Sequence, residues 1–233
     1  MVMLESCHIL RPVASLGLPK KTVVLTFDDG PNGQVTADLL DVLRGHQVRA
    51  CFNPIGENVA DGPALVRRMA EEGHLLGNHT YTHPFPLGII RWLPAQIDPT
   101  DLAIGEALGI PEYRSRFFRP PNGLLTPALH EAMRQRALRL LPVTCYIHDT
   151  AHGPATAHRV VEKLLAALRR NEGGIIVLHD GRCRRPLGLN GNPASPRSGA
   201  NRTWVPGAVE TLISTLQPEG FQFDIEAFVR MQG

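Results

Sequence analysis

Short apolar runs of β-strand type alternate along the chain with longer stretches whose apolar residues recur every three or four positions. The clearest runs are 22–27 and 174–180, which are nearly continuous in apolar residues, as parallel strands covered on both faces tend to be. A further strand is expected at 143–147, and helices are expected at 156–170 and 206–216. This alternation predicts an α/β fold with a parallel sheet. Periodicity alone leaves a (β/α) barrel and an open doubly wound sheet as alternatives.

Length and composition limit the remaining classes. The chain has 233 residues, a formal net charge of +2 and four scattered cysteines without a C-x-x-C pair. One domain over 1–233 is expected, with two small domains as the alternative, and the charge is too small for a nucleic-acid binder. The first twenty residues lack the apolar stretch of a secretory signal, and no window resembles a membrane span. We therefore expect a soluble cytoplasmic protein with neither a nucleic-acid nor a membrane partner.

Polar clusters stand where several predicted strands end. They are Asp28 with Asp29, His79 with His83, Arg119, and His179 with Asp180. Because parallel α/β folds collect active-site residues at the carboxyl ends of their strands, these clusters can converge on one mouth. The long segment 181–207 has no periodicity and is rich in Gly, Pro, Asn and Arg. It is expected to be either a functional loop beside that mouth or a locally disordered segment.

The first two clusters have the composition of a metal centre. Asp29, His79 and His83 would supply two imidazoles and one carboxylate, which suit Zn²⁺, Co²⁺, Fe²⁺ or Ni²⁺ better than Ca²⁺ or Mg²⁺. The histidine spacing alone is weak, because H-x-x-x-H arises by chance, and paired aspartates also form turns. At a divalent ion, one carboxylate can ligate while the other takes a proton from water acidified by the ion. Composition does not say which of Asp28 and Asp29 does which.

Two further residues have side chains suited to proton transfer and charge stabilisation. His179, across the pocket from a metal, could protonate a leaving amine, and Arg119 could orient a carboxylate. The alternatives are an ordinary strand-end histidine and a surface ion pair of small energetic value.

Four motifs then follow one another in a fixed order. They are TFDDGP at 26–31, HTYTH at 79–83, RPPNG at 119–123 and LHD at 178–180. In order and spacing they resemble the polysaccharide deacetylase family, also called the NodB homology domain or carbohydrate esterase family four, over roughly residues 20–225. The resemblance implies a distorted (β/α) barrel of about seven strands. It also implies metal-dependent removal of an acetyl group from an N-acetylated sugar.

The same resemblance implies a role for each matching residue. Asp28 resembles the catalytic base and His179 the general acid, while Asp29, His79 and His83 resemble the ligands of a divalent metal, for which zinc is expected and cobalt, nickel or iron are alternatives.

Other matching residues are expected to position the base or the substrate. Arg119 resembles the residue that pairs with the base, and Leu178 the apolar wall around the acetyl methyl group. Pro121 and Asn122 are expected in the substrate-binding loop, where the backbone amide near Asn122 helps to hold the oxyanion.

The chain departs from the family in the fourth motif, where D-x-x-D-W is common. Asp149 keeps the first position, but His152 and Gly153 replace the last two, and His148 lies just before them. The partner of His179 is therefore open between Asp149 and His152, and the roles of His148 and His152 are open as well.

Two other departures concern a loop and a strand. Asn122 stands where the family usually has tyrosine, which removes an aromatic surface from the pocket. Asn53 and Pro54 stand in a strand that is usually apolar in the family, and Pro54 cannot donate to a ladder, so the strand should end or bulge there.

Substrate contacts outside the motifs are indicated by aromatic and basic residues. Trp92 and Trp204 are expected to stack on sugar rings, with a buried core role as the alternative. The segment 181–207 carries five arginines that form either a solvated basic face or a site for phosphate or carboxylate on the substrate. These are Arg182, Arg184, Arg185, Arg197 and Arg202.

These features predict a metal-dependent N-deacetylase acting on a small glycan or glycoconjugate. The alternatives within the same chemistry are tailoring of an amino sugar on a natural product or nucleotide-linked sugar, O-deacetylation, deformylation and cyclic-amide hydrolysis. A sugar-binding homologue with weakened catalysis is the alternative outside enzymology.

Overall fold

Two long parallel strands form the centre of the computed structural model, which describes residues 9–84, 87–183 and 192–231. Strand β1 (Thr22–Asp28) is buried throughout and pairs with β6 (Gly173–His179) from Thr22 opposite Gly173 to Asp28 opposite His179. Both strands are rich in β-branched and apolar residues, as expected for strands covered on both faces. The two apolar runs of the sequence are therefore confirmed as central strands.

The other strands extend this pair into two parallel sheets. One sheet has the order β3-β2-β1-β6, with β7 also pairing with β1, and the second sheet pairs β4 with β5. These strands are β2 (Cys51–Asn53), β3 (Leu75–Leu76), β4 (Phe117–Phe118), β5 (Arg139–Leu140) and β7 (Gln222–Phe223). Single bridges, Asn78 with Phe118 and Cys145 with Ile176, link the sheets. The α/β class and about seven strands are confirmed, although the ladders do not form a continuous ring within the described residues.

One expected strand is shorter and lies earlier in the chain. Instead of a strand over 143–147, the structure has β5 at Arg139–Leu140, and Val143 and Cys145 form only isolated bridges. Pro142 interrupts the ladder because it has no backbone N–H to donate.

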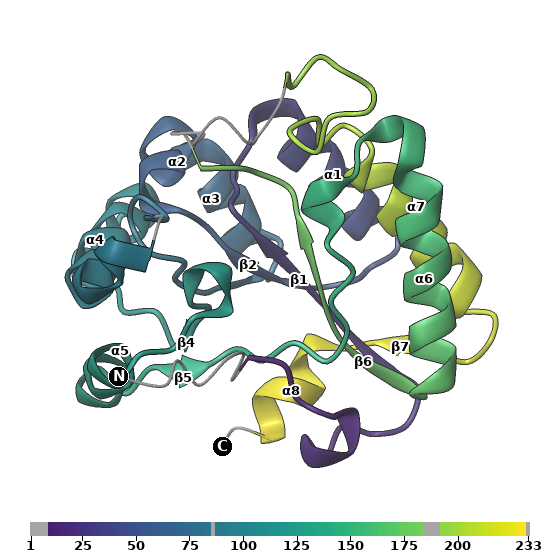
Figure 1. Cartoon of the computed structure of the whole chain (residues 1–233), viewed down its shortest axis with the longest axis horizontal. Helices are drawn as coiled ribbons and strands as arrows, with labels where there is room; N and C mark the ends of the chain where they lie inside the picture. The colour runs from purple at the N-terminus through teal and green to yellow at the C-terminus, as the bar shows by residue number, and fades with distance from the viewer. Residues whose placement is uncertain (1–8, 85–86, 184–191, 232–233) are drawn as a thin grey trace.

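Helices cover the central strands from two sides (Figure 1). One group comprises α1 (Gly33–Gly45), α6 (Ala157–Arg170) and α7 (Val205–Leu216), and the other comprises α2 (Gly56–Asp61), α3 (Pro63–Glu71) and α4 (Ile97–Leu108). Two further helices, α5 (Pro127–Gln135) and α8 (Ile225–Met231), lie below the sheet in this view. Within the described residues, no helix combines the length and apolar character needed to cross a bilayer.

The carboxyl ends of the central strands lead into irregular backbone. Asp29 directly after β1 has a φ of 70°, and Thr80 and His83 after β3 have φ values of 69° and 49°. Left-handed backbone is costly for residues other than glycine and concentrates at functional sites. On the neighbouring strand, β2 ends at Asn53, in agreement with the prediction that Pro54 would stop it.

Candidate active site

Three polar side chains stand in one row across the sheet, at the carboxyl ends of neighbouring strands. Asp28 on β1 is the register partner of Asn53 on β2 and of His179 on β6. A cavity of about 920 Å³ opens at this end of the strands, and both Asp28 and His179 line it. The spacing between adjacent strands therefore fixes the lateral distance between the two titratable groups of the row, Asp28 and His179.

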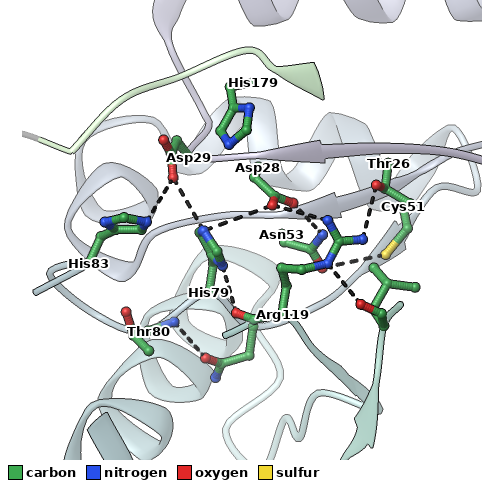
Figure 2. Close-up of polar contacts among 12 residues, drawn as sticks. Thr26, Asp28, Asp29, Cys51, Asn53, His79, Thr80, His83, Arg119 and His179 are labelled. Carbon is green, nitrogen blue, oxygen red and sulfur yellow. Dashed lines mark hydrogen bonds and ion pairs between the residues drawn. The ribbon is translucent and has the colours of Figure 1, made fainter. Parts of the chain in front are cut away.

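A cluster of one carboxylate and two imidazoles lies beside this row. Asp29, His79 and His83 point toward one another (Figure 2), and one ligand atom from each falls within 4.8 Å of the others. Oδ1 of Asp29 lies 3.3 Å from Nε2 of His79 and 3.7 Å from Nε2 of His83. The expected convergence of these three residues is thus present in the fold.

The unpaired carboxylate oxygen of the cluster fits a divalent cation. Oδ1 of Asp29 is buried and has no hydrogen-bond partner within the described residues. Nδ1 of His79 lies 2.6 Å from the carbonyl oxygen of Arg119. A carbonyl only accepts, so Nδ1 carries the proton and Nε2 presents a lone pair toward Asp29. Two acceptors facing each other in a buried site need a cation between them, and this N, N, O donor set suits zinc and related metals.

Electrostatics favour the ligating form of the groups in the cluster. Burial lowers the pKa of His83, which favours the neutral imidazole that binds metals. Burial alone would raise the pKa of Asp29, but positive charge on the neighbouring His83 and His79 holds it far below its ordinary value. A divalent cation bound between neutral imidazoles and Asp29 would favour the ionised carboxylate in the same way.

Asp28 is held at both of its carboxylate oxygens. Nη1 of Arg119 donates to Oδ2 at 3.2 Å, and Nδ2 of Asn53 donates to Oδ1 at 2.7 Å (Figure 2). Arg119 is 1% exposed and is itself fixed by bonds to Thr26 Oγ1 and to the carbonyl oxygen of Leu141. The predicted pairing of Arg119 with Asp28 is present, and it is a buried ion pair rather than a surface one.

His179 is paired with Asp149 through two hydrogen bonds. Nδ1 of His179 lies 2.8 Å from Oδ1 of Asp149, and the backbone N–H of His179 donates to Oδ2 at 2.8 Å. Burial would lower the pKa of His179, but the Asp149 carboxylate outweighs it and raises this pKa to about 9. For Asp149, burial opposes ionisation, yet the charge of His179 lowers its pKa. His179 is thus protonated at neutral pH, with Nε2 left for other partners.

Comparison with known proteins shows which family the chain belongs to. The family model for polysaccharide deacetylase matches residues 16–141, which is more than half of the chain. The chain belongs to the polysaccharide deacetylase family. A chitooligosaccharide deacetylase of Bradyrhizobium sp. (strain ANU 289) is 36% identical over 204 residues, covering 87% of each chain.

The names of relatives in this family indicate different substrates. The peptidoglycan-N-acetylglucosamine deacetylase PgdA of Listeria monocytogenes serotype 1/2a (strain 10403S) is 34% identical over 162 residues, which is 69% of this chain and 32% of the Listeria protein. Among solved structures, the Xyl-CE4 domain of a multidomain xylanase from the hindgut metagenome of Trinervitermes trinervoides aligns over 92% of each chain. Its TM-score is 0.69 and its sequence identity is 26%.

Two residues that were expected to contact the substrate do not line the cavity. In each case the preceding residue in the chain lines it instead. Leu178 is 1% exposed within the main hydrophobic core, whereas Val177 lines the cavity. Residues two apart on a strand share a face, so Val177 faces the same way as His179 and Leu178 faces the core. Likewise Pro121 is buried at the start of a short 3₁₀ turn, and Pro120 lines the cavity beside Asn122.

The two tryptophans have opposite environments. Trp204 is 7% exposed and belongs to the core at the start of α7, so the stacking role predicted for it is wrong. Trp92 is 54% exposed and lines the cavity, as the stacking role requires. Both tryptophans were expected in loops, so the sequence did not distinguish their environments. Trp204 immediately precedes α7, and it packs in the core with the buried face of that helix.

The altered fourth motif divides into a buried half and a cavity half. Asp149 takes the contact with His179, while Nδ1 of His152 lies 3.1 Å from Oγ1 of Thr156. His148 lines the cavity and stands edge-on to Tyr146, with 4.5 Å between the ring centroids. The open choice of partner for His179 is therefore resolved in favour of Asp149.

The arginines of 181–207 separate into cavity and solvent positions. Arg182 and Arg202 line the cavity, and Arg202 is 5% exposed, with its guanidinium near the carbonyl oxygens of Gly181 (3.3 Å) and Asp149 (3.4 Å). Arg197 is exposed, and Arg184 and Arg185 lie outside the described residues.

The sequence analysis assigned no contact to two of the residues that hold Asp28 and Arg119. Asn53 contacts Asp28, and Thr26 contacts Arg119. A signal for Asn53 existed in its polar character at a buried strand end, and Thr26 lies two residues before Asp28, on the same face of β1.

Proposed function

We propose that the protein is a metal-dependent N-deacetylase that removes the acetyl group from an acetamido sugar in a short saccharide or glycoconjugate. The observation that carries this proposal is the placement of Asp28 and His179 in one row, beside a three-residue cluster that fits a divalent cation. The names of the relatives, which act on chitooligosaccharide and on peptidoglycan N-acetylglucosamine, support the substrate class.

Asp28 acts as the general base. Its Oδ2 lies 4.0 Å from Nε2 of His79 and therefore faces the metal-ligand cluster, while Oδ1 faces Asn53. A carboxylate oxygen has more than one lone pair, so Oδ2 can accept a proton from the attacking water while it keeps the bond to Arg119.

His179 acts as the general acid. Its Nδ1 is engaged by Asp149, so Nε2 holds the proton that passes to the departing amine nitrogen. With a pKa of about 9, His179 carries that proton at neutral pH. This paired acid favours catalysis over the alternative of a binding protein with weakened catalysis.

Asp29, His79 and His83 would hold the metal ion. Such an ion supplies Lewis-acid activation, because it polarises the acetyl carbonyl and acidifies the attacking water. Zinc is proposed, because two imidazoles and one carboxylate are a common catalytic zinc set with a position left open.

The cavity favours a saccharide of a few rings. Its volume of about 920 Å³ exceeds the space that one sugar ring needs, and Trp92 and Tyr146 provide aromatic surface on its wall.

A second candidate substrate carries a negative charge. Arg182 lines the cavity at a partly exposed position, and a guanidinium binds carboxylate or phosphate through parallel hydrogen bonds. Arg202 adds positive charge to the wall, although its buried guanidinium already contacts two carbonyl oxygens. This observation favours a nucleotide-linked or acidic acetamido sugar within the same reaction.

Acetate release tests both candidates. The metal-loaded protein is incubated with N-acetylglucosamine oligomers of one to five units, with UDP-N-acetylglucosamine and with an acetamido sugar that bears a carboxylate, and the metal content is measured in parallel. Release from the neutral oligomers supports the first candidate, and release from the anionic sugars alone supports the second. Bound metal and bound sugar without any acetate would overturn the enzymatic proposal.

A further inference from the structure

The row of residues across the sheet contains one member to which the proposed reaction assigns no role. Asn53 ends β2 at the level of Asp28 and is 0% exposed. A buried side-chain amide is costly unless its polar atoms are bonded, so a polar residue at this strand end needs a partner. Its contacts therefore indicate what this polar side chain does.

Asn53 makes its short hydrogen bond to the proposed base. Nδ2 donates to Oδ1 of Asp28 at 2.7 Å, which is a charge-assisted bond when Asp28 is ionised. The other end of the amide faces Sγ of Cys51 at 3.7 Å. A carboxylate oxygen accepts only, so the NH₂ group must face Asp28, and this assignment fixes which way the amide points.

The fold leaves a space for this amide. A Cβ atom built at Gly77 would come within 2.2 Å of Oδ1 of Asn53, so any larger residue there would displace the amide. The absence of a side chain at Gly77 therefore leaves the room that the Asn53 amide occupies.

The two partners of Asp28 divide its oxygens between them. Asn53 occupies Oδ1, and Arg119 donates to Oδ2 from the other side, so rotation of the carboxylate about its last torsion would break both bonds. Of the two oxygens, the Asn53 bond leaves Oδ2 directed at the metal-ligand cluster, 4.0 Å from Nε2 of His79. Without Asn53, the single hydrogen bond from Arg119 would be the one side-chain contact in the described residues that opposes this rotation.

We infer that Asn53 is a positioning residue that locks the Asp28 carboxylate so that Oδ2 is its proton-accepting atom. The inference rests on the proposed deacetylation, with Asp28 as the base. It assigns to Asn53 an effect on turnover and none on substrate or metal binding.

The test compares Asn53→Leu, which keeps the volume but removes the donor, with the smaller Asn53→Ala in case leucine impairs folding. Thr144→Val is the matched control, because it removes a hydroxyl that bonds Ile175 near the opposite end of β6 from His179. For each metal-loaded protein, kcat and KM for acetate release, metal content and thermal unfolding are measured. Because the lost hydrogen bond is to a charged group, we expect kcat to fall about 10- to 100-fold. KM and metal content should stay within about 2-fold of wild type.

Two results would overturn the inference. One is a kcat of both Asn53 variants within about 2-fold of wild type, and the other is an equal loss of kcat in Thr144→Val. A crystal structure of Asn53→Leu gives a readout that does not depend on turnover, and it is expected to show the Asp28 carboxylate rotated or in two orientations. If wild type released no acetate from any sugar, the proposed function would fail, and this structure would still decide the positioning role. An unchanged Asp28 would then refute it.

Discussion

Two hydrogen bonds join His179 to the carboxylate of Asp149, one from its imidazole and one from its backbone N–H. Nδ1 of His179 and its backbone N–H each contact a different oxygen of Asp149, both at 2.8 Å. The carboxylate therefore fixes the ring in one orientation and one tautomer while it stabilises the imidazolium. Asp149 is 1% exposed, so water screens this pair little.

The first prediction is a pH dependence set by this pair. The pKa of His179 is raised to about 9, so the protonated acid persists below that pH and is lost above it. We expect kcat to fall as the pH rises through about 9. In Asp149→Asn the counter-charge is gone while burial remains, so this alkaline limb should move about one to three pH units lower. Profiles of kcat against pH for both proteins measure the shift, and an unmoved limb in the variant contradicts the pairing.

Replacement of the base should separate turnover from metal binding. Asp28→Asn keeps the shape and the contact area but cannot accept the proton, and we expect kcat to fall about 10²- to 10⁴-fold. Metal content should stay close to wild type, because Asp28 is outside the ligand cluster. Elemental analysis and acetate release on the same preparation check both parts. Substantial residual turnover would assign the base to another residue.

Removal of a proposed metal ligand should weaken metal binding itself. His83→Ala deletes one of the three proposed ligands, so the affinity for zinc should fall by more than about 100-fold. His152→Ala is the control, because His152 belongs to a different hydrogen-bonded pair. Titration with zinc under a competing chelator measures the affinities. Equal zinc affinity of His83→Ala and wild type would remove His83 from the site.

The two tryptophans provide a matched pair of substitutions. Trp204→Ala empties a core position and should destabilise the fold by about 3–5 kcal/mol. Trp92→Ala, at an exposed position, should leave the unfolding free energy within about 0.5 kcal/mol of wild type. It should instead raise KM for oligosaccharides about 3- to 10-fold through lost stacking. Denaturant unfolding and steady-state kinetics of both variants check these values, and a reversal of the two effects would disprove the assignment.

The sequence predicted the features that depend on local pattern. The central strands appear as apolar runs because both of their faces are covered, and the polar residues that follow them converge because parallel strands end at one edge. For this reason Asp29, His79 and His83 could be grouped before their distances were known.

Features that depend on side-chain direction or on distant packing were predicted poorly. Leu178 and Val177 differ by one position on β6, and only the register of the strand decides which faces the cavity. Trp204 is buried because α7 packs against the core, which its flanking sequence does not reveal. The contact between Asn53 and Asp28 depends on the pairing of β1 with β2, two strands separated by a helix.

The proposed base and the proposed acid are register partners on adjacent strands, whereas Trp92, His148 and Arg182 reach the cavity from segments between the strands. The segment that carries Trp92 contains none of the residues proposed for proton transfer or metal binding. Its exchange between relatives should therefore change the preference for a saccharide without realignment of Asp28 and His179. The segment that carries His148 differs, because it also contains Asp149 and cannot be exchanged without a change at the partner of His179.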